Sequence, residues 1–91
     1  MAGKLRLWGF DGDERRLLFD STGNIPALRA VLERARPHAE IGGLWLVQAS
    51  VAELDEMYSL VEALMDGTRR RRQLDVLEGL RATLCTSIDG F

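Results

Sequence analysis

The fold is decided by residues 50–88, which read SVAELDEMYSLVEALMDGTRRRRQLDVLEGLRATLCTSI. Ser50 and Glu53 have the S-x-x-E spacing of a capping box, which predicts that a helix begins directly after Ser50. Apolar residues then recur at helical spacing as far as Met65, and again from about Gln73 to Ile88. The pattern predicts two consecutive helices, 51–66 and 73–88, that form an antiparallel helical hairpin.

Each of these helices has an apolar face that covers about half of its circumference. A helix lying on one sheet typically needs an apolar stripe little wider than ~100°, so each face has surface left over after a single contact. In the favoured explanation, the helices pack one flank against each other and the other flank against a sheet. In the alternative, a second subunit buries the remaining flank.

A β-hairpin is predicted over residues 4–20. The runs 4–10 and 15–20 alternate polar and apolar side chains well enough to be strands, and the segment Asp11-Gly12-Asp13 between them has turn chemistry. Alternate side chains of a strand point to opposite faces, so the register of this hairpin decides which residues reach the core.

Two pairs of residues compete for the core side of this hairpin. Pairing centred on Gly12 places Leu5 and Leu7 in the core and leaves Trp8 and Phe10 among arginines on the other face. A shift of one residue in the register exchanges the two faces. The pattern leaves the facing open, and we take Trp8 and Phe10 as candidates for an exposed surface.

A helix over residues 25–36 is predicted to follow the hairpin. Asn24 is placed to cap this helix, and Pro26 falls in its first turn, where the missing N–H group is not needed. The helix is expected to end before Pro37. The next element is a strand over residues 44–49, whose nearly continuous apolar sequence indicates a central or covered position.

The predicted order of elements is β-β-α-β-α-α. Gly42-Gly43 is interpreted as a bend at the entry to the last strand, because residues 39–41 are too short a run to form a hairpin partner. A right-handed crossover places the third strand beside the first. We therefore expect a single α+β domain over residues 1–91, with three helices and a three-stranded antiparallel sheet of order 2-1-3. Such a sheet leaves two edges and one open face for a second copy.

Length and composition limit the possible classes of protein. The 91 residues are enough for one domain without metal or disulfide staples, and 46% hydrophobic with 29% charged residues excludes a disordered chain. No apolar run approaches the ~18 residues of a membrane span, and the first residues contain no signal-peptide core. The single cysteine cannot form an intrachain disulfide. We expect a small soluble domain of bacterial type in the cytoplasm, without a membrane.

Charge is distributed unevenly along the chain. Between Arg36 and Arg69 there are six acidic residues and no lysine or arginine, whereas Arg69 to Arg72 are consecutive. The four arginines are the only sign of nucleic-acid binding, and a domain with a net charge of −2 lacks the usual broad basic footprint. The favoured interpretation is a solvated role near the preceding helix end, with pairing to Glu62 or Asp66.

The polar residues form no recognisable catalytic or metal-binding pattern. Cys85 would need a base, and the one histidine, His38, lies in a remote connector; a buried hydrophobic role for Cys85 is favoured. Asp11, Asp13 and Glu14 lack the remaining ligands of a calcium loop and are interpreted as a turn. We expect neither enzyme activity nor a bound cofactor or metal.

The sequence favours a function by protein–protein interaction, beginning with a second copy in a homodimer. The predicted surface combines aromatic residues, leftover helix flank and a charged rim. Its members are Trp8, Phe10, Met57, Tyr58, Met65, Arg69, Arg70, Arg71 and Arg72. One alternative is a nucleic-acid-associated regulator that uses the arginine loop. Another is a small-ligand-binding or catalytic domain with a pocket between sheet and helices.

Overall fold

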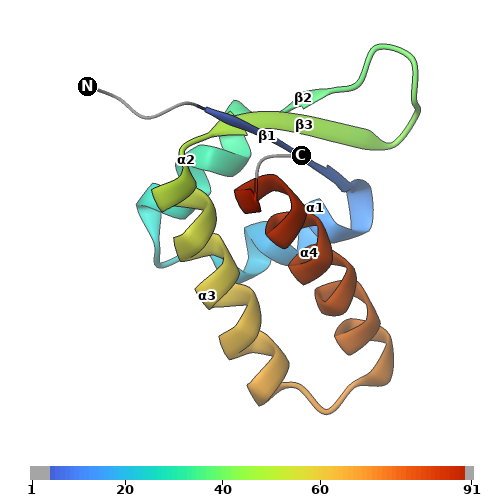
Figure 1. Ribbon diagram of the computed structural model, residues 1–91. Coiled ribbons are helices and arrows are strands. Elements are labelled where there is room, and N and C mark those ends of the chain that lie inside the picture. The colour runs from blue at the N-terminus through green and yellow to red at the C-terminus, as the bar shows by residue number, and fades with distance from the viewer. Residues whose placement is uncertain (1–4, 90–91) are drawn as a thin grey trace.

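The computed structural model describes residues 5–89. The elements in chain order are β1 (Arg6–Asp11), α1 (Gly12–Ser21), α2 (Pro26–Arg34), β2 (Arg36–Pro37), β3 (Leu44–Ala49), α3 (Val51–Gly67) and α4 (Arg71–Asp89). The strands form one sheet, the helices gather on one side of it, and α3 and α4 extend away as a hairpin (Figure 1). The predicted α+β class, the three-stranded antiparallel sheet and the C-terminal helical hairpin are confirmed.

The capping box places the start of α3 where the sequence predicts it. The Ser50 hydroxyl accepts from the Glu53 N–H at 3.1 Å, and the Glu53 carboxylate accepts from the Ser50 N–H at 2.9 Å. Both contacts satisfy N–H groups that the first turn would otherwise leave without partners. The hairpin packs α3 against α4, as the favoured explanation of the wide apolar faces requires. α4 also packs against β1, whereas α3 packs against α2 rather than against the sheet.

The predicted hairpin over residues 4–20 is wrong, because residues 12–21 form a fourth helix, α1. Its start is a second capping box. The Asp11 carboxylate accepts from the Glu14 N–H at 2.8 Å, and the Glu14 carboxylate accepts from the Asp11 N–H at 2.9 Å. Leu18 then points into the core and is fully buried. The D-x-x-E capping signal outweighs the weak alternation of residues 15–20.

The sheet has the order β1-β3-β2. The antiparallel pairing of β1 with β3 agrees with the predicted neighbours, but the third strand is the two-residue β2 rather than residues 15–20. β2 and β3 form a hairpin, so the interpretation of Gly42-Gly43 as a simple bend is wrong. Gly43 has a φ of +82°, a left-handed conformation that favours glycine in this turn.

The helix predicted over residues 25–36 is shorter at both ends. α2 begins at Pro26 and ends at Arg34, because Arg36 and Pro37 join the sheet. Pro26 stands at the start of the helix as expected. Asn24 is not the cap: Ile25 occupies that position, and no side chain caps this helix.

The two faces of β1 are the reverse of those predicted with pairing centred on Gly12. Trp8 and Phe10 are buried, with 0% and 1% of their surfaces exposed, whereas Leu5 and Leu7 are 57% and 58% exposed. The Trp8 indole N–H donates to the Thr83 hydroxyl at 3.1 Å. The helices thus cover the face of β1 that carries the two aromatic rings.

Candidate interaction surfaces

The side of the sheet turned away from the helices is the first candidate surface. We define the outer sheet face by the residues that the strand register places on this side, together with the adjoining Leu5. It comprises Leu5, Leu7, Gly9, Asp11, Arg36, Leu44, Leu46 and Gln48. All but Asp11, Arg36 and Gln48 are apolar or glycine. Antiparallel sheets commonly present polar residues to water on such a face.

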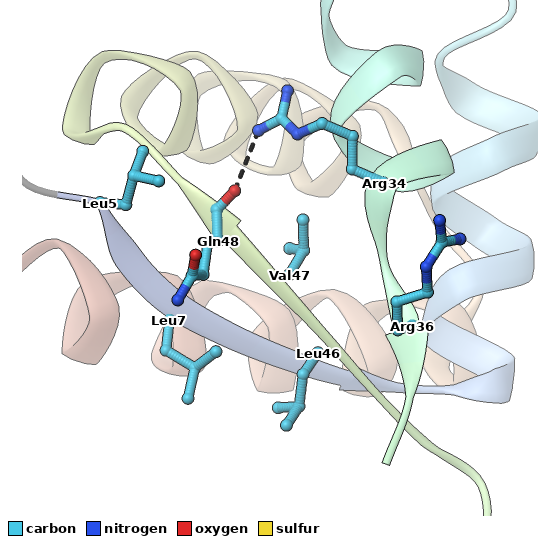
Figure 2. Close-up of a pocket in the computed structure, with 7 residues that line it drawn as sticks. All are labelled: Leu5, Leu7, Arg34, Arg36, Leu46, Val47 and Gln48. Atoms are coloured by element: carbon cyan, nitrogen blue, oxygen red, sulfur yellow. Dashed lines mark hydrogen bonds between the residues drawn. The ribbon is translucent and has the colours of Figure 1, made fainter. Parts of the chain in front are cut away.

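Two shallow hollows mark this face. The first has a volume of about 460 Å³ and is bordered by Leu5, Leu7, Leu46 and Gln48, with Arg34 and Arg36 along its far side (Figure 2).

The second hollow has a volume of about 380 Å³ and lies where the outer sheet face meets α4. Leu46 borders both hollows. A Cβ atom at Gly9 would lie 3.0 Å from the Leu46 Cδ2 atom, so the glycine leaves room for this leucine on the face.

At both edges of the sheet, side chains donate hydrogen bonds to backbone carbonyls that have no partner strand. At the β1 edge, the Ser87 hydroxyl of α4 donates to the Leu7 carbonyl at 2.9 Å. Along β3, beyond the short β2, the Arg34 guanidinium donates to the Gln48 carbonyl at 3.0 Å. Blocking unpaired backbone groups hinders pairing with another strand. The outer sheet face is therefore the more accessible route to a partner.

Arg34 is held in place by Glu53. Its two terminal nitrogens lie 3.0 and 3.1 Å from the Glu53 carboxylate oxygens, in a bidentate pair. The hydrogen bonds from Arg34 lower the pKa of Glu53 below its ordinary value, and the hydrogen bond from the Ser50 N–H is the second largest cause of this shift. The same carboxylate thus caps α3 and positions the guanidinium at the sheet edge.

The structure does not bring the predicted surface residues together. Trp8, Phe10 and Met57 lie in the core, where no partner can reach them without rearrangement. Tyr58 and Met65 are half-buried and pack against the core from α3. The sequence pattern does not identify the exposed leucines of the outer sheet face, because their exposure depends on which face of β1 the helices cover.

The four arginines lie at the turn between α3 and α4, at the end of the hairpin far from the sheet (Figure 1). We call Arg69, Arg70, Arg71 and Arg72 the arginine tip. All four are exposed. Within residues 5–89 the ion pairs are Arg29–Glu33 and Arg34–Glu53, so the expected pairing of the tip with α3 carboxylates is not found.

Cys85 is exposed on α4, so its predicted burial is wrong. The neighbouring Cys85 side chain, and next burial, raise the pKa of the Tyr58 phenol. His38 lies in the β2–β3 loop, where its Nδ1 atom accepts from the N–H groups of Glu40 and Ile41. His38 therefore organises the loop.

Two further tests concern metals and membranes. Among residues 5–89, no three histidine, cysteine or carboxylate side chains are grouped closely enough to hold a metal ion. In the same part of the chain, no helix combines the length and the apolar character needed to cross a membrane.

No family profile matches the chain, and neither a curated protein nor a solved structure shows significant similarity to it. The outer sheet face and the arginine tip are therefore the two candidate surfaces for function.

Proposed function

We propose that this chain is an interaction domain that self-associates through its outer sheet face. The observation that carries the proposal is the exposure of Leu5 and Leu7, at 57% and 58%, beside the partly exposed Leu44 and Leu46. Among the described residues, the only other large apolar side chain so exposed is Ile41, at 55%. Contiguous apolar surface of this kind is typical of protein contact sites.

The chemistry of the face favours a second copy as the occupant. Gln48 carries both a donor and an acceptor, so two copies related by a two-fold axis can satisfy each other's amides. The one carboxylate of the face, Asp11, lies at the end of β1 and accepts from the Glu14 N–H. The one cation of the face, Arg36, has no ion pair within residues 5–89 and stands on the β2 edge, where it can remain in water. The face therefore combines an apolar centre with a polar rim.

The size of the face predicts a weak dimer. Two strands of six residues at ~3.4 Å per residue and ~4.8 Å spacing, with the two-residue β2 beside them, give roughly 230 Å² per copy. Two copies together bury about 460 Å² by this measure, well below the ~1,200 Å² at which stable complexes begin. We expect an equilibrium between monomer and dimer that depends on concentration.

Sedimentation equilibrium over a concentration series tests the proposal. Because weak interfaces have dissociation constants in the micromolar to millimolar range, the series should run from about 10 μM to about 1 mM. The expected result is an average mass that rises from one chain toward two. A mass of one chain at every concentration would refute self-association and direct the search toward a different protein partner.

A further inference from the structure

The start of α4 departs from the usual distribution of charge in helices. Helix N-termini carry a partial positive charge, so acidic residues are favoured in the first turn and cations are disfavoured. α1 and α3 follow this rule with Asp13, Glu14 and Glu53. α4 has no acidic residue in its first turn and instead begins with Arg71 and Arg72.

The side-chain hydrogen bonds at the start of α4 come from neutral groups and leave this positive charge without a counter-charge. The Thr68 hydroxyl accepts from the Arg70 N–H at 3.3 Å and donates to the Gln73 side chain at 2.9 Å. In the part of the chain that the structure describes, no carboxylate lies within ion-pair distance of the arginine tip. Four exposed guanidinium groups are thus concentrated where the helix itself already attracts anions.

A surface hollow lies beside the tip. It has a volume of about 470 Å³, and Thr68, Arg69, Arg70 and Gln73 form its polar side. Guanidinium groups bind phosphate oxygens through two parallel hydrogen bonds. Local rules are most often broken in natural proteins at functional sites, and the arginine tip breaks the rule for helix N-termini.

We infer that the arginine tip binds the phosphate backbone of a double-stranded nucleic acid. The tip is small, so several negative charges must fit within the reach of four side chains. A duplex supplies one charge per ~1.7 Å of its axis, a higher density than an acidic peptide with at most one carboxylate per ~3.3 Å. The acidic residues of α3 repel a polyanion, and the tip follows the last of them along the chain, at the end of the hairpin (Figure 1).

This contact is independent of the outer sheet face and reads no base sequence. With four phosphate contacts, the logarithm of affinity is expected to fall with the logarithm of salt concentration at a slope of about −3.6. Loss of one arginine–phosphate contact lowers affinity about eightfold at ~0.1 M salt. Substitution of two arginines therefore lowers affinity by about 60-fold and reduces the slope by about 1.8.

The test is fluorescence anisotropy of a labelled duplex of random sequence, titrated with the full chain at several salt concentrations. The test variant is Arg71→Gln combined with Arg72→Gln, because glutamine has nearly the same helix propensity as arginine. Arg16→Gln, an exposed site on α1, is the control for loss of a positive charge elsewhere. The double variant should bind weakly, and the control should bind nearly as the unmodified chain does.

Thermal unfolding of the same variants gives a second readout. Removing two cations from the first turn of α4 should raise Tm by a few degrees while binding becomes weaker, an outcome that a misfolded variant cannot produce. The inference is overturned if the unmodified chain does not bind the duplex at ~25 mM salt, where counterion release favours binding most. It is also overturned if the double variant binds equally well, or if a polyglutamate peptide binds as tightly as the duplex.

Discussion

Replacing Leu7 by glutamine should weaken self-association without unfolding the chain. Complete burial of a leucine side chain contributes about 1.5–3 kcal/mol, so covering its exposed 58% contributes about 1–1.7 kcal/mol. In a two-fold dimer the residue occurs twice, and the loss becomes about 2–3.5 kcal/mol. Since ~1.4 kcal/mol corresponds to a factor of ten, the dissociation constant should rise by about 30-fold or more.

Sedimentation equilibrium measures this change directly, and urea unfolding at a concentration where the chain is monomeric checks the fold. The unfolding free energy should fall by less than about 1 kcal/mol, because most of the Leu7 side chain is already in water. Ile41→Gln is a matched control, since Ile41 is 55% exposed but lies in the β2–β3 loop beyond the strands. An unchanged dissociation constant for Leu7→Gln, or an equal change for Ile41→Gln, would refute the assignment of the interface to the outer sheet face.

Three further predictions concern the sheet edge and the helices. Arg34→Ala should lower the unfolding free energy by about 1 kcal/mol and leave the Gln48 carbonyl without its hydrogen bond. Light scattering should then detect assemblies larger than a dimer. Scattering like that of the unmodified chain would show that Arg34 does not prevent pairing at this edge of the sheet. Gly79→Ala should raise the unfolding free energy by about 0.5–1 kcal/mol in urea titrations, because alanine favours the helix. The added Cβ lies 3.4 Å from the Glu14 carboxylate, which must move by a small distance. Destabilisation would show that the Glu14 side chain cannot move away. The pKa of Glu53 is lowered in the fold, so its contribution is present above the ordinary value of 4.5 and is lost as pH falls through the lowered value. The difference in unfolding free energy between the unmodified chain and Glu53→Gln should therefore shrink in acid, and a constant difference between pH 7 and pH 3 would exclude an ionic contribution.

The elements that could be predicted from the sequence are those with strong local signals. The capping box at Ser50 and the helical spacing after it define α3, and the same reasoning placed α4 within two residues at its start. Asp11 and Glu14 have the equivalent capping-box spacing, which predicts the start of α1. The same residues also fit a turn followed by an alternating strand, so the sequence pattern alone is ambiguous there. β2 has two residues and forms only against β3, so no local pattern can reveal it.

The candidate site was predictable only in part. The arginine tip is evident from four consecutive residues, but its position in the first turn of α4 is not. The outer sheet face depends on the facing of β1, which is a long-range property. Leu7 and Trp8 are adjacent in sequence, and the helices that cover Trp8 decide that Leu7 is left in water.

The contacts that tie β1 to α4 also have a consequence for synthesis of the chain. Trp8 bonds to Thr83 across 75 residues, and Leu7 bonds to Ser87 across 80. The first strand therefore emerges from the ribosome long before the helix that protects its edge. Contacts between such distant segments form late in folding and leave an unpaired edge exposed in the meantime. We expect the edge of β1 to be open to pairing with other chains until α4 packs against it.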